Sequence, residues 1–297
     1  MQNSTLSLVG IPWDIGASFG QPGARYAPDE IRDNLDYFFG RAKENEIFDV
    51  VRAEKLDLNH FEYEDLGNLN LKYHDIKSSI QIMEDKARDI LDSGKNIIAI
   101  GGDHSVTYPL VKALHDFGEK SIGLIQFDAH LDLLDESEKQ GKFSQSSEIF
   151  RAMELENVKP GHVVQIGVRG YNYPEAFDFI KNNNIIQFTP KDVNQLPMKK
   201  IYRIIRKDII EKVDYLYLTF DIDVLDPAYA PGVGVVEPDG LNPSQCFELL
   251  KLLAPEVDAF DLVEVNPMLD HNGITSRTGA KLIFDFMINK VFERGEI

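Results

Sequence analysis

Two short acidic motifs hold the residues of this chain that are best suited to chemistry: Asp128-Ala-His-Leu-Asp132 and Asp221-Ile-Asp223. Each follows an apolar run, residues 122–127 and 215–220, that is typical of a buried strand. Alternate side chains of an extended segment project to one face, so each motif can aim its carboxylates and imidazole at one point. Five such groups at the ends of buried strands would repel one another or titrate unless a cation lay among them. The two motifs therefore predict a metal site, with enough ligands for two ions.

The elements that must position these motifs follow from the apolar pattern of the whole chain. Strand-like runs recur near residues 6–12, 48–56, 96–101, 122–128, 162–168, 185–189, 215–221 and 258–264. Several are continuously apolar, which indicates strands buried on both faces. Helix-period stripes lie between them, over 75–93 and 198–213, and Asn242-Pro-Ser opens a further helix. This alternation predicts the α/β class, with a parallel sheet of roughly eight strands and helices on both faces.

Polar residues stand where four of these strands end, and this distinguishes the chain from other α/β folds. The Gly-x-Gly-x-x-Gly turn of a dinucleotide-binding fold is missing, and so is the lysine motif of a phosphate-binding loop. Instead, His104, Asp128, Asp221 and Glu264 each follow a strand-like run. In parallel sheets, ligands bind in the crevice outside the carboxyl ends of the strands. We therefore expect these four residues to meet at one rim.

Composition limits the class of partner. The formal charge of −18 argues against nucleic acid or an anionic membrane and favours the approach of cationic small molecules. Cys246 is the one cysteine, so no disulfide can form within the chain, which suits a reducing cytoplasm. The N-terminus lacks a signal-peptide pattern, and no run reaches the roughly 20 apolar residues of a membrane span. We expect one soluble, cytoplasmic domain over residues 1–297.

The expected metal ligands form a mostly oxygen-rich set of two imidazoles and four carboxylates: His104, Asp128, His130, Asp132, Asp221 and Asp223. Such hard ligands favour Mn²⁺ or a similar octahedral cation over a tetrahedral zinc site built on thiolates. Two cations about 3.5–4 Å apart need bridging carboxylates, and a water between them can ionise near neutral pH. The set therefore predicts a hydrolytic centre with two metal ions.

These motifs resemble those of the ureohydrolase family, which includes arginase, agmatinase, guanidinobutyrase and formiminoglutamase. The matching segments are Gly101-Gly-Asp-His-Ser105, Phe127-Asp-Ala-His-Leu-Asp132, Phe220-Asp-Ile-Asp-Val-Leu-Asp-Pro227 and Val263-Glu-Val-Asn-Pro267, together with Gly10-Ile-Pro-Trp-Asp and Pro22-Gly-Ala-Arg near the start. The likeness runs from about residue 8 to about residue 285. It implies a three-layer α/β/α fold with an eight-stranded parallel sheet, and assembly as a homo-oligomer, a trimer or a hexamer.

The resemblance also implies roles for individual residues. One Mn²⁺ would be held by His104, Asp128, Asp132 and Asp221, and the other by Asp128, His130, Asp221 and Asp223, so that Asp128 and Asp221 bridge. A hydroxide between the two ions would attack the guanidinium carbon of a small-molecule substrate. Asp132 would hold the hydrogen bond of this hydroxide. Glu264 would pair with the guanidinium, a charge-assisted contact.

The substrate is the harder question. The small polar residues that follow the metal motif in arginases are absent, and the agmatinase-like start favours hydrolysis of agmatine to putrescine and urea. Agmatinases carry a downstream histidine that is thought to move a proton to the leaving amine. Gln145 stands at that place here, and an amide cannot titrate between pH 5 and 8.

Three interpretations of Gln145 remain open. The proton can travel by water or through another residue, for which His271 is a candidate. Alternatively the substrate is formiminoglutamate, since similar family members also lack the histidine, and Arg277 would then attract a carboxylate tail; guanidinobutyrate is a related alternative. The third interpretation is a metal-binding family member without catalytic activity.

Overall fold

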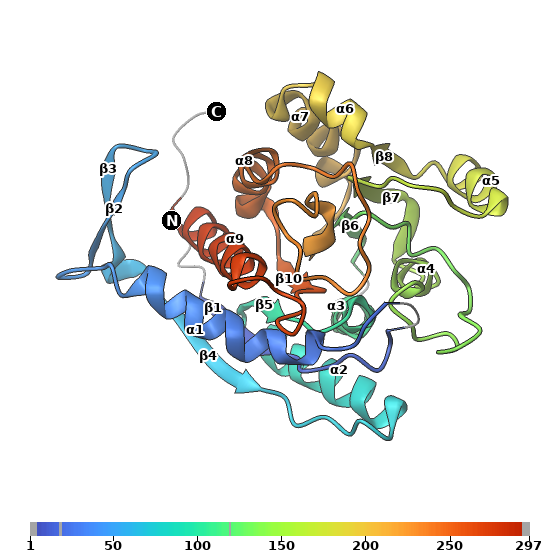
Figure 1. Cartoon of the computed structure of the whole chain (residues 1–297), viewed down its shortest axis with the longest axis horizontal. Coiled ribbons are helices and arrows are strands. Elements are labelled where there is room, and N and C mark those ends of the chain that lie inside the picture. Colours follow the sequence, from blue (N-terminus) through green and yellow to red (C-terminus); the bar gives the residue numbers. More distant parts are fainter. Residues whose placement is uncertain (1–4, 18–19, 119, 293–297) are drawn as a thin grey trace.

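In the computed structural model, residues 5–17, 20–118 and 120–292 are described, and a parallel sheet forms their centre (Figure 1). Its strands are β1 (Leu6–Gly10), β4 (Tyr63–Asn68), β5 (Asn96–Ile100), β6 (Ile122–Phe127), β7 (Val158–Ile166), β8 (Ile186–Phe188), β9 (Tyr215–Asp221) and β10 (Ala259–Val263). The main helices are α1 (Ala27–Phe39), α2 (Ile76–Asp92), α3 (Thr107–Phe117), α4 (Glu148–Met153), α5 (Pro174–Asn183), α6 (Pro190–Gln195), α7 (Met198–Asp208), α8 (Pro243–Leu253) and α9 (Ile274–Val291).

Helices cover both faces of the sheet, which confirms the predicted three-layer α/β/α architecture. One apolar core joins the sheet to α1, α7, α8 and α9, and the other joins it to α2, α3 and α4. Successive residues of β5 belong to different cores: Ile98 and Ile100 face the first, Ile97 and Ala99 the second. Figure 1 shows α9 and α3 on opposite sides of β5 and β10. This two-sided burial explains why the run reads as continuously apolar.

The strand order brings the polar strand ends together. The sheet has the order β4-β1-β5-β10-β9-β6-β7-β8, and every pairing within it is parallel. The strands that precede His104, Asp128 and Glu264, and the strand that ends at Asp221, are β5, β6, β10 and β9, which lie side by side in the centre. Their carboxyl ends therefore form one continuous rim, as the sequence predicted.

Predicted helices agree with the structure where a cap and an apolar stripe coincide. Asp75 caps α2 by accepting a hydrogen bond from the backbone N–H of Ser78 (3.0 Å). Asn242 and Gln245 form a reciprocal capping box at the start of α8, with Pro243 in its first turn. The stripe over 198–213 continues as α7 and then as a single 3₁₀ turn.

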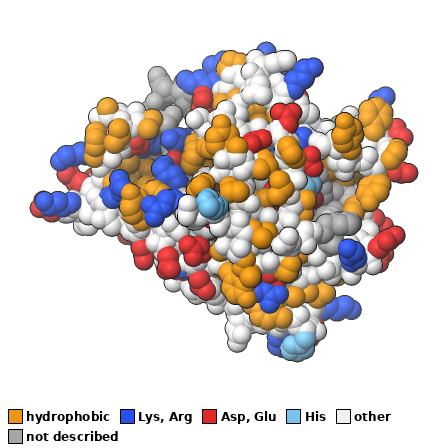
Figure 2. Space-filling view, in the orientation of Figure 1, with side chains coloured by type: hydrophobic (Ala, Val, Ile, Leu, Met, Phe, Trp, Pro, Cys, Tyr) orange, Lys and Arg blue, Asp and Glu red, His pale blue; other side chains and the backbone are white. Residues whose placement is uncertain are grey.

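One predicted strand is wrong. The run 48–56 forms no strand of the main sheet but the turn and second strand of a two-stranded antiparallel hairpin, β2 (Glu46–Asp49) and β3 (Glu54–Asp57). The chain reverses because the Asp49 carboxylate accepts hydrogen bonds from the N–H groups of Val51 (2.9 Å) and Arg52 (3.1 Å). Figure 2 shows apolar side chains at this end of the molecule, where Val51 is exposed.

The apolar pattern did not reveal β4, which completes the eight-stranded sheet. Its sequence, Tyr-Glu-Asp-Leu-Gly-Asn, is mostly polar and mostly exposed or half-buried. It lies at the edge of the sheet, where it pairs with β1 alone. An edge strand needs no continuous apolar run, so a count based on such runs overlooks it.

Within the described residues, no helix is both long and apolar enough to cross a membrane.

Candidate metal centre

The Nδ1 atom of His104 lies at the centre of a buried group of carboxylates. Asp128 Oδ2 lies 3.0 Å from it, Asp132 Oδ2 3.1 Å and Asp221 Oδ2 3.3 Å. His104 is 1% exposed, and this nitrogen has no hydrogen-bond partner among the described residues. A buried nitrogen that faces only acceptor oxygens is the arrangement expected of a metal ligand.

A second group of ligand atoms adjoins the first through Asp128. The Nδ1 atom of His130 lies 3.4 Å from Asp128 Oδ1 and 3.0 Å from Asp223 Oδ2. Asp128 thus turns one oxygen to His104 and the other to His130, as a bridging carboxylate would. Asp221 approaches the first group through Oδ2, and its Oδ1 accepts a hydrogen bond from the Asp223 N–H (2.7 Å). The structure brings all six sequence-predicted ligands together at one rim.

Close backbone packing places the His104 loop. Asp103 caps the 3₁₀ turn that begins at His104, through a hydrogen bond from the Ser105 N–H (3.1 Å). A Cβ atom on Gly102 would lie 1.6 Å from the carbonyl oxygen of Trp13. Glycine is therefore required where the Trp13 segment crosses the loop, and the Asp103 N–H donates to that same carbonyl (2.7 Å).

A buried hydroxyl determines which nitrogen of His104 is free to bind a cation. Thr219 Oγ1 donates to Asp261 Oδ1 (2.6 Å) and lies 2.8 Å from His104 Nε2. Because its proton is directed to Asp261, the Thr219 oxygen accepts the Nε2–H, which leaves a lone pair on Nδ1. Thr107 and Tyr217 donate to the other Asp261 oxygen and hold that carboxylate in place. This is the outer support that metal-binding imidazoles usually have.

An amide ladder supports the aspartates from the other side. Gln126 Nε2 donates to Asp128 Oδ2 (2.7 Å) and also lies 3.2 Å from Asp132 Oδ2. Gln165 donates to the Gln126 carbonyl (2.7 Å), and Gln187 donates to that of Gln165 (2.8 Å). These three glutamines are register partners on β6, β7 and β8. The ladder fixes the carboxylates without supplying any positive charge.

Two site residues adopt backbone conformations that side chains rarely take. Asp132 has φ 53° and Glu264 has φ 63°, and both are buried. Such left-handed positions are uncommon outside glycine and cluster at functional sites. Glu264 is held by its N–H, which donates to the Gly102 carbonyl (2.8 Å), and by Oε1, which accepts from the His104 N–H (2.8 Å). The predicted guanidinium-binding glutamate therefore lies against the His104 loop.

The pKa values of the clustered side chains show that bringing their carboxylates together is unfavourable without a cation. Burial, followed by the charge of Asp128, raises the pKa of Asp132 to about 6. Burial also raises the pKa of Asp221 well above its ordinary value. Burial opposes a charged imidazole, yet the surrounding carboxylates outweigh it and raise the pKa of His104. Without cations the cluster must therefore hold extra protons, and divalent ions would replace them.

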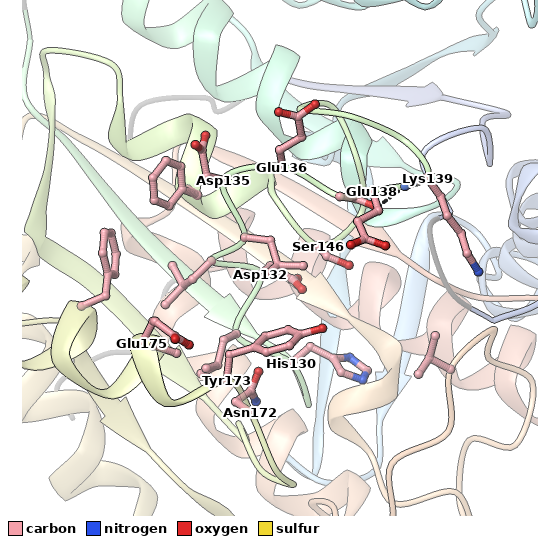
Figure 3. Close-up of a pocket in the computed structure, with 18 residues that line it drawn as sticks. His130, Asp132, Asp135, Glu136, Glu138, Lys139, Ser146, Asn172, Tyr173 and Glu175 are labelled. Atoms are coloured by element: carbon pink, nitrogen blue, oxygen red, sulfur yellow. Dashed lines mark hydrogen bonds between the residues drawn. The ribbon is translucent and has the colours of Figure 1, made fainter.

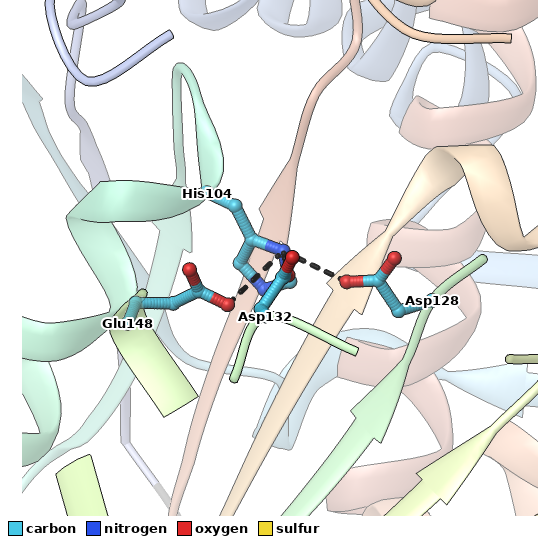
Figure 4. A group of neighbouring side chains, drawn as sticks. All are labelled: His104, Asp128, Asp132 and Glu148. Atoms are coloured by element: carbon cyan, nitrogen blue, oxygen red, sulfur yellow. Dashed lines mark ion pairs between the residues drawn. The ribbon is translucent and has the colours of Figure 1, made fainter. Parts of the chain in front are cut away.

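Glu148, at the start of α4, is a member of the cluster that the sequence analysis missed. Together with His104, Asp128 and Asp132, it offers one ligand atom in a group whose atoms all lie within 4.8 Å of one another (Figure 4). No strand precedes it, so the pattern of polar residues at strand ends could not find it. The available signal was a lone acidic residue in the segment Ser147-Glu-Ile-Phe150, in which Ile149 is fully buried.

A pocket of about 810 Å³ opens beside His130 and Asp132 (Figure 3). This size is typical of a small-molecule site. Besides apolar walls, its lining has four acidic side chains outside the metal cluster: Asp135, Glu136, Glu138 and Glu175. Lys139 is the one lysine or arginine in this lining, within the described part of the chain. Glu138 and Glu175 lie on either side of Asp132 in the view of Figure 3.

The three predicted substrate-tail residues occupy different surroundings. Gln145 is buried, and its N–H donates to the Gly16 carbonyl (2.8 Å). His271 is exposed and contacts the neighbouring Asn272. Arg277 donates to Asn34 and stacks over Tyr37, 4.1 Å from the ring centre. None of the three lines the pocket, so their proposed substrate contacts remain predictions, and the contacts of Arg277 with α1 give its role no support.

Replacing Thr219 with Val tests the tautomer argument. The variant keeps the side-chain shape but cannot accept the His104 Nε2–H, so we expect divalent-metal affinity to fall by about 10–100-fold. Calorimetric titration of the metal-free protein with Mn²⁺ measures this affinity. Thr219→Ser retains the hydroxyl and should remain near the wild-type value. Equal affinities for the Val variant and wild type would contradict the assigned role.

Comparison with known proteins gives consistent results. The arginase family model matches residues 4–289. The guanidinopropionase of Pseudomonas aeruginosa is 31% identical over 284 residues, covering 95% of this chain and 85% of that protein. The agmatinase of Neisseria meningitidis serogroup C is 31% identical over 284 residues, which cover 94% of this chain and 85% of the agmatinase.

A solved structure, the formimidoylglutamase of Bacillus subtilis, superposes with a TM-score of 0.85 at 25% identity, covering 96% of this chain and 87% of that one. The resemblance found from the motifs is thus confirmed, and so is the fold class. The chain belongs to the arginase family of hydrolases, which are binuclear metal-dependent enzymes acting on guanidino C–N bonds.

Proposed function

We propose that this chain is a Mn²⁺-dependent amidinohydrolase that converts agmatine and water to putrescine and urea. The observation that carries the choice of substrate is the acidic pocket beside His130 and Asp132. Agmatine combines a guanidinium group with an ammonium tail, and an excess of carboxylates around a pocket favours cations. The same pocket disfavours tails that carry carboxylates.

The residues that would hold two Mn²⁺ ions are those gathered around the two imidazoles. His104, Asp128, Asp132 and Asp221 would hold one ion, and Asp128, His130, Asp223 and Asp221 the other, with Asp128 and Asp221 as bridges. When bound, such a pair supplies Lewis-acid chemistry and lowers the pKa of water enough to give a nucleophile near neutral pH. The orphaned His104 Nδ1 and the predominance of carboxylates support hard cations at this site.

The chain's own residues would orient the reaction. The Glu264 carboxylate would pair with the guanidinium through charge-assisted hydrogen bonds. Its rigid attachment to the His104 loop would keep the guanidinium carbon close to the metal ligands. Asp132 would hold a proton-bearing oxygen beside that carbon, and the Gln126 amide would maintain its orientation.

A second candidate is the hydrolysis of formimidoylglutamate, favoured by the amide of Gln145 at the place of a proton-transferring histidine. The pocket argues against this substrate. Formimidoylglutamate carries carboxylates, and Lys139 is the one lysine or arginine among the described lining residues that could attract them, whereas the acidic side chains of the lining would repel them. Guanidinobutyrate has a carboxylate tail and meets the same obstacle. The third candidate is a metal-binding protein without hydrolytic activity.

Three further properties belong to the proposal. We propose that residues 1–297 act as one catalytic domain, supported by a family match over 4–289. We propose a homo-oligomer, a trimer or a hexamer, because members that carry these motifs assemble in this way. The absence of paired cysteines supports a reducing, cytoplasmic setting.

A substrate panel separates the candidates. Manganese-loaded protein should release urea from agmatine with a higher kcat/KM than from guanidinobutyrate, because only agmatine has a cationic tail. Urea and formamide assays on agmatine, guanidinobutyrate, arginine and formimidoylglutamate make the measurement. Release of formamide without urea would identify formimidoylglutamate as the substrate in place of agmatine. A metal-loaded protein that hydrolyses none of the four compounds would support the third candidate, a metal-binding protein without hydrolytic activity.

Replacing Asp128 with Ala tests the bridging assignment. One bridge serves both ions, so the variant should lose both, from two metals per chain to none after dialysis. Elemental analysis measures the content, and Asp85→Asn, an exposed aspartate on α2, serves as the control. Two retained metals per chain would contradict the bridging role.

Substituting Gln145→His tests whether proton transfer limits turnover. An imidazole titrates near neutral pH, so the rate on a guanidino substrate should rise around pH 7. Rates from pH 6 to 10 should show the gain concentrated at the neutral end. An unchanged profile would indicate that protons reach the leaving amine by another route.

A further inference from the structure

Glu148 is a buried carboxylate for which the proposed function has no use. Its side chain is 1% exposed, and neither carboxylate oxygen has a hydrogen-bond partner among the described residues. Its Oε1 lies 3.6 Å from His104 Nδ1. In Figure 4, Glu148 and Asp128 approach the His104 ring from opposite sides. An unpaired carboxylate in such a place needs a partner of positive charge.

Two neighbouring side chains of the described residues could supply that charge, Arg151 and His104. Arg151 lies one turn further along α4, but its guanidinium pairs with Asp135 and with Glu154 (3.0 Å). With Nε2 donating to Thr219, His104 Nδ1 either carries a proton in the metal-free protein or offers its lone pair to a cation. Arg151 therefore forms no salt bridge with Glu148, and His104 pairs with it (3.6 Å) only when Nδ1 carries a proton, a position that a bound cation would take over.

The start of α4 is fixed in place, so Glu148 cannot turn out to solvent. Ile149 and Ala152 are fully buried in the core on the α2–α3 face of the sheet. The Phe150 N–H donates to the Asp132 carbonyl (3.2 Å), which ties the helix to a metal-ligand residue. The Glu148 carboxylate therefore stays beside the His104 site in every state that preserves this packing.

We propose that Glu148 is an additional ligand of the cation at His104. Its Oε1 lies 3.6 Å from His104 Nδ1, which is within the separation of at most about 4.4 Å that two ligands at about 2.2 Å from one ion can have. With Asp221, the site then offers one imidazole nitrogen and four carboxylates.

This ligand set has chemical consequences. A fourth carboxylate adds negative charge and a hard oxygen donor, which raises affinity for octahedral cations such as Mn²⁺ relative to Zn²⁺. It also occupies a position that water would otherwise take at the His104 ion. The inference rests on the metal centre of the proposed function but not on the identity of its substrate.

The test is the variant Glu148→Gln, measured by metal binding and by thermal unfolding. The first Mn²⁺ should bind at least about tenfold more weakly, and chelator challenge should leave about one ion per chain in place of two. The rise in unfolding temperature on adding Mn²⁺ should be smaller.

Glu84→Gln is the matched control. Glu84 is also a buried glutamate on a helix, but its carboxylate pairs with Lys112 (3.3 Å). Its loss should lower the stability of the metal-free protein and leave Mn²⁺ affinity unchanged. A Glu148→Gln variant with wild-type Mn²⁺ affinity would overturn the inference.

Two further measurements separate ligation from a general charge effect. Glu148→Asp keeps the charge but shortens the side chain, so it should match Glu148→Gln in weakened metal affinity; wild-type affinity would overturn direct ligation. Anomalous scattering from Mn²⁺-loaded wild-type crystals should place a Glu148 oxygen within coordination distance of the His104 ion. A carboxylate turned away from a bound ion would overturn the proposal even if no variant folds.

These outcomes are independent of catalysis. Glu148 bound to metal in a protein that releases no urea would support the ligand and contradict the proposed function. Urea release from agmatine, with a Glu148 that does not contact the ion, would support the proposed function and contradict the ligand assignment.

Discussion

The repulsion among carboxylates packed around one imidazole nitrogen is the constraint on which the rest of this structure depends. Two like charges 4 Å apart repel by about 4 kcal/mol at the dielectric typical of protein sites. Asp128, Asp132 and Asp221 all turn an oxygen toward His104 Nδ1 at 3.0–3.3 Å. The fold must hold them there until cations arrive, and a looser scaffold would let them separate into water.

Several parts of the fold supply that rigidity without supplying charge. The four central strands deliver the ligands from backbone positions fixed on both sides by neighbouring strands. The glutamine ladder from Gln126 to Gln187 crosses three strands and restrains the aspartates by neutral amides. Lysines or arginines at those positions would neutralise the ligands and compete with the metal. A neutral, hydrogen-bonded support therefore suits a site whose positive charge must come from bound ions.

The sequence predicts what is local to a strand and misses what only folding brings near. His104, Asp128 and Asp221 were predictable because an apolar run and a polar end are adjacent in the chain. Glu148 was not, because it follows a loop and reaches the site through packing of α4 on the Asp132 backbone. The edge strand β4 escaped for a related reason, since its partner, not its composition, makes it a strand. The role predicted for Arg277 stays a prediction: its position near a motif does not fix where the side chain points, and in the fold it stacks over Tyr37.

Specificity for the substrate tail is separable from the metal chemistry. Two relatives with different activities, a guanidinopropionase and an agmatinase, are each 31% identical to this chain. Overall identity therefore cannot choose between tails of opposite charge. The acidic pocket side chains lie on the loop after Asp132 and near the start of α5, outside the sheet that fixes the ligands. Loops of this kind can change charge while the sheet keeps its ligands in place. Asp135 is paired with Arg151, which leaves Glu136, Glu138 and Glu175 against Lys139, and this negative charge is a better guide to the substrate than the motifs shared by the family.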